Sequence, residues 1–503
     1  MKKYLEHIVV LVIGVTLIGG ILYKTGTISS GYHFLDDHEL IRIEYSLKEQ
    51  QVTVFEGIRS WQLNDLSWRF RPLYWVERVA GTAIMGSSLF YWNCYKAVQG
   101  IFTFYLLYFT ARYLKNKWHS SFLFAAIIML GEQFMPWYRS ANQENTGLFL
   151  CALTLWLIAL QYHRKKYTAA GYNILICLSA IACGLVKESF TIFMPVFPAM
   201  MFWLEYCRED MAGSKGYWKK CLKRNGLAYT VILFGFAVNV YFIAFRVGVD
   251  KVGYAGFDES TGLKQYYYGI RDSLLVFLKW YTLVGILLIA AVILCYQLIE
   301  KEKRKFYIGL ALISGYIIGT QLAAHAKSLM AGRYIIPAIV GYGLLFILLG
   351  YQIFEKDRFR RKVYLTVLVV LLLLEVPAAV KNARDYTYDG RLIGQFLQSI
   401  MDHTSPDSVI IGTFTDEELN LATSSWLEVN ERTKEYTHDQ ATGDLKDTIQ
   451  LAALNLEEIT WEDAHVVLGY AGDKESMLAM MGIEDEQGYS FHEFGKYALI
   501  VRE

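Results

Sequence analysis

The chain has 503 residues, of which 54% are hydrophobic and only 19% are charged, below the roughly 25% of charged residues in ordinary soluble domains. Its 49 Lys and Arg residues and 48 Asp and Glu residues give a net charge of +1. This composition excludes an ordinary soluble domain, and the balanced charge gives no sign of a nucleic-acid partner.

Apolar runs recur along the chain, and each is long enough to cross a hydrocarbon core of roughly 30 Å. They predict about eleven transmembrane helices near 6–23, 88–111, 119–133, 145–162, 168–185, 189–206, 227–245, 273–299, 306–324, 334–353 and 363–380. The first run follows Met-Lys-Lys without a clear small-residue cleavage site, so we expect a retained helix and not a signal peptide. The predicted fold class is an α-helical polytopic membrane protein.

Basic loops set the orientation of these helices, because Lys and Arg in short loops stay in the cytoplasm. The loops that follow the second, fourth, sixth, eighth and tenth helices are ARYLKNKWH, HRKKY, KKCLKRNG, EKEKRK and EKDRFRRK. The N-terminus is therefore expected in the cytoplasm. The long loop 24–72 and the C-terminal segment are expected on the outer side.

The C-terminal segment differs in charge from the rest of the chain. Residues 382–503 hold 24 acidic and 8 basic residues, a net charge of −16, which leaves +17 for residues 1–381. GRLIGQFLQSIMDHT has helical spacing, and SVIIGTF, AHVVLGY and YALIVRE have the β-branched character of strands. The sequence predicts a transmembrane domain over 1–381 and a small soluble α/β domain over 382–503.

Four short segments on the predicted outer side carry charge beside a helix end, where ionisable groups often mark a functional path. They are LDDHE (35–39), WRFRPLYW (68–75), GLVKESFTIFMP (184–195) and AGRYIIP (331–337). Their order resembles that of the GT-C fold membrane glycosyltransferases, and most of all the protein O-mannosyltransferase-like enzymes and their bacterial relatives. Members of this family transfer a sugar from a polyprenyl-phosphate carrier to an acceptor outside the membrane.

The resemblance implies roles for individual residues. The acids after the first helix, Asp36 and Asp37, are expected at the catalytic centre, with Asp36 as the base. The cations expected to bind the donor phosphate are Arg71, Lys187 and Arg333. The residues expected to shape the site or contact the acceptor are Glu39, Glu144, Glu188 and Tyr334. The acid pair reads Asp-Asp-His here and not Asp-Glu, which leaves the substrate class open.

The chemistry of the reaction fits these residue types. Transfer from a lipid phosphate needs a base for the acceptor hydroxyl and cations for the departing phosphate. Simpler interpretations remain: Arg71 could pair with Asp65, and Lys187 with Glu188. No cofactor is certain, although His38 beside two carboxylates is compatible with a divalent metal.

The predicted function is therefore an inverting glycosyltransferase whose partners are a polyprenyl-phosphate-linked sugar, membrane lipid and a protein, polysaccharide or lipid acceptor. A transporter or flippase for lipid-linked sugars is one alternative, but transporters usually contain internal repeats, and none is evident here. A non-catalytic assembly partner is the other alternative.

Overall fold

The structure is a computed structural model that describes residues 2–34, 36–140, 142–165, 170–207, 216–248, 264, 267–268, 271, 301–324, 332–350, 357–439, 445–447, 459–483 and 487–503. The chain forms two compact units. Unit 1 comprises Met1–Lys24, Ser60–Val76 and Tyr95–Asn382, and unit 2 comprises Thr25–Arg59, Glu77–Cys94 and Ala383–Glu503.

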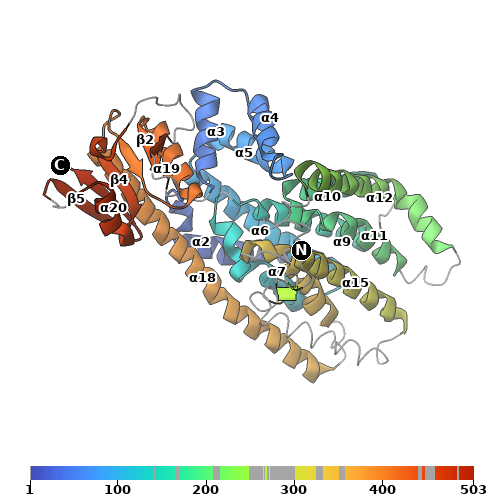
Figure 1. The fold of residues 1–503 in the computed structure, drawn as a ribbon. Coiled ribbons are helices and arrows are strands. Elements are labelled where there is room, and N and C mark those ends of the chain that lie inside the picture. Colours follow the sequence, from blue (N-terminus) through green and yellow to red (C-terminus); the bar gives the residue numbers. More distant parts are fainter. Residues whose placement is uncertain are drawn as a thin grey trace. The chain divides into compact units, whose positions relative to one another are not determined.

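Unit 1 is built from helices (Figure 1). Its long elements are α1 (Lys2–Gly14), which continues through η1 (Val15–Gly19) into α2 (Gly20–Lys24), most of α6 (Leu89–Tyr113), α7 (Trp118–Met129), α9 (Glu144–Arg164), α10 (Ala170–Val186), α11 (Phe193–Tyr206), α12 (Tyr217–Tyr241), α15 (Lys301–Ala324), α16 (Ile336–Gly343) and the first part of α18 (Arg358–His403). Its short elements are η3 (Glu132–Phe134), α8 (Met135–Tyr138), η4 (Glu188–Phe190), η5 (Phe242–Gly248), η8 (Gly332–Ile335) and η9 (Leu344–Leu349). Within the unit, α10 packs on α9 and α12, and α16 packs on α7 and α15.

Several of these helices are suited to a membrane. Within the described residues, the spans Tyr4–Lys24, Glu144–Arg164, Trp218–Gly248 and Arg358–His403 are long and apolar enough to cross one, and Trp118–Met129, Ala170–Val186 and Arg333–Phe346 are shorter apolar helices. The chain is therefore an integral membrane protein, as the sequence predicts. The expected helix 273–299 lies outside the described residues, so the predicted number of eleven stays a prediction.

The predicted outer loop 24–72 is mostly helical. It contains α3 (His38–Lys48) and α4 (Val54–Asp65), and it leads into α5 (Pro72–Met85). Apolar runs in the sequence do not predict these helices, because the helices are short and mix charged with apolar residues. Pro72 begins α5, a position that suits proline because no backbone N–H is needed there.

Unit 2 contains a six-stranded mixed sheet in the order β3-β2-β1-β4-β6-β5. The strands are β1 (Ile410–Gly412), β2 (Glu435–His438), β3 (Leu445–Asp447), β4 (Val466–Tyr470), β5 (Tyr489–Phe494) and β6 (Tyr497–Arg502). β1 is parallel to β2 and β4, with Ile410 opposite Glu435 and Val466, and the other pairs are antiparallel. The predicted strands are β1, β4 and β6, whereas β2, β3 and β5 were not predicted. The remaining elements of the unit's C-terminal part are α19 (Glu417–Val429), η10 (Trp461–Asp463), η11 (Ala471–Asp473) and α20 (Lys474–Met480), and η2 (Thr27–Ser29) lies in its N-terminal part.

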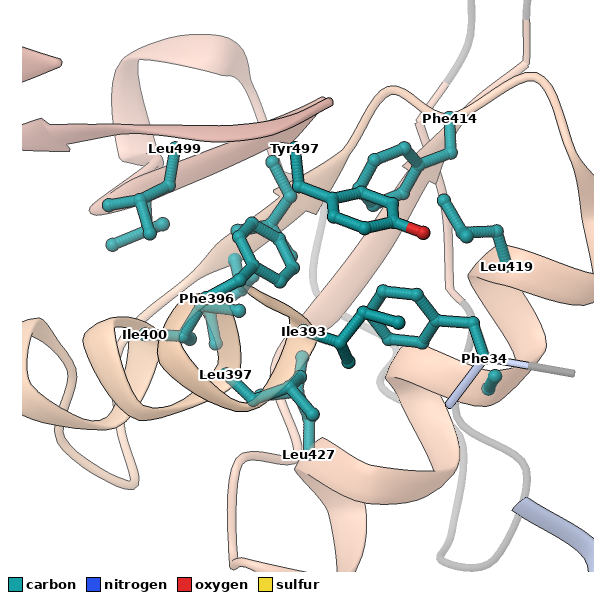
Figure 2. Packing of buried hydrophobic residues seen from close by; sticks show 14 of the residues in the cluster. Phe34, Ile393, Phe396, Leu397, Ile400, Phe414, Leu419, Leu427, Tyr497 and Leu499 are labelled. Atoms are coloured by element: carbon teal, nitrogen blue, oxygen red, sulfur yellow. The ribbon is translucent and has the colours of Figure 1, made fainter. Parts of the chain in front are cut away.

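Both faces of this sheet are covered by apolar contacts, because successive residues of a strand point to opposite faces. Ile410 belongs to a core with Phe396 of α18 and Leu427 of α19, whereas Ile411 belongs to a second core with Met477 of α20. Figure 2 shows the first of these cores.

An aromatic residue of the N-terminal segment completes the first core. The Phe34 ring meets the Tyr497 ring edge-on at 5.2 Å and the Phe396 ring at 6.2 Å (Figure 2). In addition, α3 packs on α19. Residues 25–59 are therefore part of the same folded unit as the C-terminal sheet.

The domain boundary that the sequence suggests near residue 382 falls inside a helix. α18 runs without a break from Arg358 to His403 and passes from unit 1 into unit 2. The predicted helix GRLIGQFLQSIMDHT is the last part of α18. The charge composition of the chain changes at this point, but the helical backbone continues.

Candidate functional site

A buried cluster in unit 1 joins two of the predicted phosphate-binding cations to one carboxylate. Glu144 is the first residue of α9, Lys187 lies between α10 and η4, and Arg333 lies in η8. The Glu144 Oε1 atom is 2.5 Å from Lys187 Nζ and 3.9 Å from Arg333 Nε. The side chains of Glu144 and Lys187 are only 2% and 6% exposed.

Tyr334 completes this cluster from the residue next to Arg333. Its hydroxyl accepts a hydrogen bond from Arg333 Nη2 at 2.8 Å, and its ring centroid lies 4.4 Å from Lys187 Nζ. A cation over an aromatic face is stabilised by the ring quadrupole, more strongly so away from water. Tyr334 thus contacts both cations.

The electrostatics of the cluster favour an anion. Two cations contact the carboxylate of Glu144, and these three groups together carry a net charge of +1. The N-terminus of α9, a helix of 21 residues, adds the positive end of its dipole. Buried charges are costly unless they are paired, and an anionic ligand would add a partner for the cations.

A polar network extends from the cluster to α6. Asn142 Oδ1 accepts from Arg333 Nη1 at 2.8 Å, and the Asn142 carbonyl accepts from Lys96 Nζ at 3.2 Å. Lys96 Nζ also donates to Asn145 Oδ1 at 3.1 Å, and the Asn145 amide donates to Gln99 Oε1. Lys96 is itself only 2% exposed. A third buried cation therefore belongs to the same network.

Lys96 and Asn142 are not among the site residues that the sequence predicts. A signal for Lys96 is present, because a lysine within the long helix α6, seven residues after its first residue, is by default a functional candidate. Asn142 has no comparable signal, since a neutral amide in a polar loop is common.

Arg71 is held by Asp65, the last residue of α4. Its Nε and Nη2 atoms donate to the two oxygens of Asp65 at 2.8 and 3.1 Å, and its guanidinium lies 4.4 Å from the Tyr74 ring centroid. This is the simpler interpretation of the RFRPL motif, and the structure confirms the contact. Such a two-pronged pair is geometrically specific.

Glu188 connects the Arg71 segment to the residue next to Lys187. Its Oε1 atom accepts from the Phe70 backbone N–H at 2.9 Å, and the Phe70 ring stacks on Phe242 at 4.6 Å. The alternative interpretation of Lys187–Glu188 as an ion pair is not what the structure shows, because Lys187 pairs with Glu144 and Glu188 binds a backbone amide.

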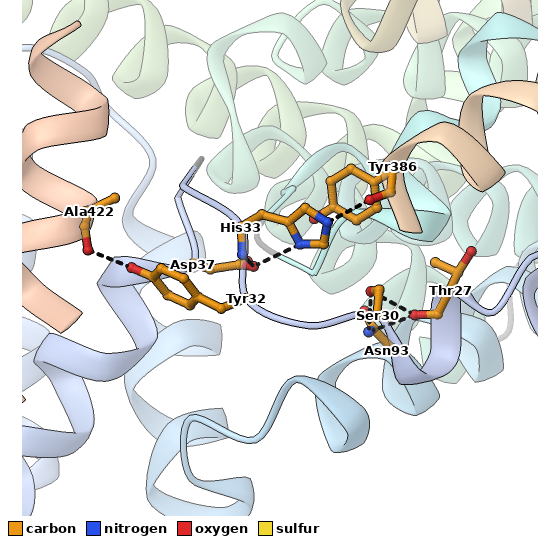
Figure 3. A network of polar contacts seen from close by, with 8 residues as sticks. All are labelled: Thr27, Ser30, Tyr32, His33, Asp37, Asn93, Tyr386 and Ala422. Atoms are coloured by element: carbon orange, nitrogen blue, oxygen red, sulfur yellow. Dashed lines mark hydrogen bonds and ion pairs between the residues drawn. The ribbon is translucent and has the colours of Figure 1, made fainter. Parts of the chain in front are cut away.

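The two adjacent acids of unit 2 have different surroundings, and Figure 3 shows those of Asp37. Asp37 is 1% exposed, and its Oδ2 accepts from the His33 backbone N–H at 3.1 Å and lies 3.5 Å from His33 Nδ1. The His33 ring donates through Nε2 to the Tyr386 carbonyl at 2.9 Å and stacks on the Tyr386 ring. Asp37 therefore fixes the loop against α18.

Close backbone packing explains the glycines beside this network. A Cβ atom on Gly390 would lie 2.6 Å from His33 Nε2, and one on Gly31 would lie 2.9 Å from the Gly390 carbonyl oxygen. Real Cβ atoms do not approach this closely, so only glycine permits the contact.

Asp36 differs from its neighbour in both backbone and exposure. It is partly exposed and has a φ of 62°, the left-handed region that costs a non-glycine residue about 1–2 kcal/mol. Strained residues of this kind cluster at functional sites. Of the two acids, Asp36 is the one that solvent reaches more readily.

His38 and Glu39 follow at the start of α3. Burial, helped by the charges of Arg42 and Arg78 and opposed by the carboxylates of Asp36 and Asp37, lowers the pKa of His38 to about 4, so its imidazole is neutral at pH 7. Glu39 Oε2 lies 3.6 Å from Nε of the buried Arg78. Among the described residues, no group of three or more His, Cys, Asp or Glu side chains is found that could hold a metal ion.

The structure therefore brings Glu144, Lys187, Arg333 and Tyr334 together in unit 1 and adds Lys96 and Asn142 to them. Arg71 and Glu188 form a second group of contacts in unit 1. Asp36, Asp37, His38 and Glu39 lie together in unit 2.

Comparison with known proteins gives a match in structure only. No family model and no curated protein matches the sequence. The crystal structure of ArnT from Cupriavidus metallidurans bound to undecaprenyl phosphate matches with a TM-score of 0.53 and 13% identity over 97% of both chains. The apo structure of the same protein matches with a TM-score of 0.49 and 12% identity over 97% of both chains. Along nearly its whole length, the chain therefore has the GT-C fold of ArnT.

Proposed function

We propose that the protein is an inverting membrane glycosyltransferase that transfers a sugar from a polyprenyl-phosphate carrier to an acceptor on the outer side of the membrane. The observation that carries this proposal is the buried cation cluster of Lys187 and Arg333 around Glu144 at the N-terminus of α9. The GT-C fold shared with a protein crystallised with undecaprenyl phosphate supports the same ligand class.

The cluster suits the leaving group of such a reaction. When the anomeric carbon–oxygen bond breaks, the carrier departs as a phosphate monoester and gains negative charge. Lys187 and Arg333 stabilise that charge in a site from which water is largely excluded. Arginine adds a planar fork that matches two phosphate oxygens. Arg71 reaches the phosphate in this proposal only if it leaves Asp65.

Asp36 acts as the base in the proposed reaction. The acceptor hydroxyl oxygen attacks the anomeric carbon, the bond from this carbon to the phosphate oxygen breaks, and the hydroxyl proton passes to the Asp36 carboxylate. Attack opposite the leaving group inverts the anomeric centre. Asp37 stabilises the loop that carries the base, and Glu39 does so through Arg78.

The likeness of the short motifs to protein O-mannosyltransferase-like enzymes suggests a hexosyl, mannosyl-type donor. The acceptor is a protein, a surface polysaccharide or a lipid. The active face is placed outside the cell because the basic loops are expected in the cytoplasm.

Two measurements on the full-length protein in lipid nanodiscs test the proposal. The first is undecaprenyl phosphate binding, where Lys187→Ala and Arg333→Ala each remove a charged contact worth about 1.5–3 kcal/mol, an expected loss of about 10- to 100-fold in affinity. Arg224→Ala is the matched control, since Arg224 pairs with the buried Glu205 at 3.0 Å in the same unit and is expected to leave binding unchanged.

The second measurement is sugar transfer from a panel of polyprenyl-phosphate sugars, followed as release of the free carrier phosphate. Wild-type protein should release carrier from at least one donor, and Asp36→Asn should not. Unchanged binding in both folded cation variants, together with no release from any donor, would remove this function.

A further inference from the structure

One buried hydrogen-bond donor of the cation cluster has no partner. The Nδ2 atom of Asn142 is inaccessible to solvent and makes no hydrogen bond within the described part of the chain. The residue is only 3% exposed. Leaving a buried amide donor unsatisfied costs about 1–3 kcal/mol, so a donor of this kind in a folded protein requires an explanation.

The orientation of this amide is set by its neighbour. An arginine side chain carries donors only, and Arg333 Nη1 lies 2.8 Å from the other terminal atom of Asn142. That atom must therefore be the carbonyl oxygen, and the atom without a partner must be the NH₂ group. Rotating the amide would place two donors against each other, so the unsatisfied group is a donor and not a misassigned acceptor.

The surroundings of this donor select an anion as its missing partner. Arg333 contacts the Asn142 side chain and Lys96 contacts its carbonyl. The residue directly precedes Gln143, the N-cap of α9, and Glu144 beyond it binds Lys187. A ligand oxygen that accepts from Asn142 would thus lie among cations and at the positive end of a long helix. A neutral acceptor could accept the hydrogen bond from Asn142, but it would gain nothing from the positive charges of the neighbouring cations.

We propose that Asn142 Nδ2 donates a hydrogen bond to a phosphate oxygen of the polyprenyl-phosphate carrier, which makes Asn142 a ligand-contacting residue of the phosphate site. The inference rests on the proposed function and adds a residue to it. Asn142 contributes in two ways. Its Oδ1 atom accepts from the Arg333 guanidinium and holds it in position, and its Nδ2 atom donates a hydrogen bond to an acceptor oxygen of the phosphate.

Asn142→Asp is the most informative substitution. It keeps the size of the side chain and an oxygen for Arg333, but it replaces the donor by a charged acceptor that repels phosphate. We expect its affinity for undecaprenyl phosphate in nanodiscs to fall by at least about 100-fold, with an unchanged or higher melting temperature. Asn142→Ala, which removes the donor without adding charge, should lower affinity by about 10-fold.

Asn145→Asp is the matched control for added charge. Asn145 lies in the same network and contacts Lys96, but both ends of its amide already have partners. The Asn145→Asp substitution introduces the same charge three positions away, and we expect the affinity for undecaprenyl phosphate to fall by less than about 3-fold. Equal losses in Asn142→Asp and Asn145→Asp would indicate a general field effect and would overturn the proposed contact.

An Arg333→Ala background separates a direct contact from an effect through Arg333. If Asn142 touches phosphate, Asn142→Asp should still weaken binding by about 10-fold or more in this background. If it acts only by orienting Arg333, the additional loss should vanish, and the proposal is then wrong. Lys187→Ala separates a failure of the Asn142 contact from a failure of the proposed function. If Lys187→Ala weakens undecaprenyl phosphate binding and Asn142→Asp does not, the Asn142 contact is wrong but the proposed function stands. If neither variant weakens binding, both are wrong.

Discussion

At the residue scale, two neighbouring acids have different surroundings. Asp37 is buried against His33, whereas Asp36 is partly exposed on a left-handed backbone. We expect Asp36→Asn to lower turnover by about 100-fold or more with carrier binding retained, because it removes the proposed base and keeps its size. Asp37→Asn should have a milder effect on turnover, since an amide oxygen can still accept from the His33 N–H.

Release of carrier phosphate and binding of undecaprenyl phosphate, measured on both variants, test this assignment. Asp37→Ala is the control for structure: it leaves the buried His33 N–H without its acceptor and should cost about 1–3 kcal/mol of stability. A dead Asp37→Asn variant beside an active Asp36→Asn variant would exchange the two roles.

His38 gives unit 2 a predictable response to acid. Burial lowers its pKa in the folded protein to about 4, whereas an unfolded histidine titrates near 6.5. As pH falls from about 6.5 to 4, the unfolded state therefore binds a proton that the folded state does not, and stability falls by up to about 3 kcal/mol. Above pH 6.5 this residue adds no pH dependence.

Thermal melting of wild-type protein and a His38→Gln variant at pH 7.5 and 5.0 checks the sign of this effect. Glutamine cannot be protonated in this range, so the wild-type protein should lose more stability on acidification than the variant does. Equal losses would mean that His38 is protonated in the folded state.

Contacts between residues that are far apart in the sequence cannot be predicted from the sequence alone, and they limit how much of the site it predicts. Asp36, Lys187, Glu144 and Arg333 can be selected as candidates because each is charged and lies beside an apolar helix. The contact between His33 and Tyr386 spans 353 positions, and no local pattern indicates it. The same holds for Asn142, whose importance arises from Arg333 and not from its own neighbours in sequence.

At the element scale, hydropathy was sufficient for long membrane helices and insufficient for short amphipathic ones. The spans α9 and α12 follow from uninterrupted apolar runs, whereas α3 and α4 mix charged and apolar residues and lie within the predicted outer loop 24–72. Three strands were found from their β-branched residues. The missed strand β2 contains Glu435, Thr437 and His438, so its place in the sheet depends on pairing with β1 and not on its own composition.

The segment 66–71 between α4 and α5, which we call the hairpin, contacts a carboxylate outside it. Glu188 accepts the Phe70 N–H next to Arg71, and a backbone bond to a charged acceptor is worth about 1.5–3 kcal/mol. We expect Glu188→Ala to loosen the segment and speed amide hydrogen exchange at 68–72, as measured by mass spectrometry. Glu188→Gln keeps an acceptor oxygen and should stay near wild type.

Arg71→Gln serves as the comparison for this experiment. It removes the Asp65 pair but leaves the Glu188 contact, so exchange at Phe70 should change less than in Glu188→Ala. If Glu188→Ala and wild type exchange at the same rate, the hydrogen bond does not hold the hairpin.

At the scale of the whole molecule, the two units do not follow the order of the chain. Unit 2 combines residues 25–59 and 77–94 with the C-terminal sheet, because Phe34 enters the sheet core and α3 packs on α19. The proposed base thus belongs to the same folded unit as the acidic C-terminal segment. A boundary drawn from composition at residue 382 separates parts of the chain that fold together.

Charge also predicts on which side of the membrane unit 2 lies. Residues 1–381 carry +17 and residues 382–503 carry −16, and the basic loops of the membrane part are expected in the cytoplasm. We therefore expect a cysteine introduced at the exposed Ser476 of α20, in a cysteine-free background, to react with a membrane-impermeant maleimide in intact cells. The control is Lys220→Cys in the basic segment of α12, which is also exposed and should react only after the membrane is permeabilised. The opposite pattern would place unit 2 and Asp36 in the cytoplasm, where a donor presented on the outer face could not reach them.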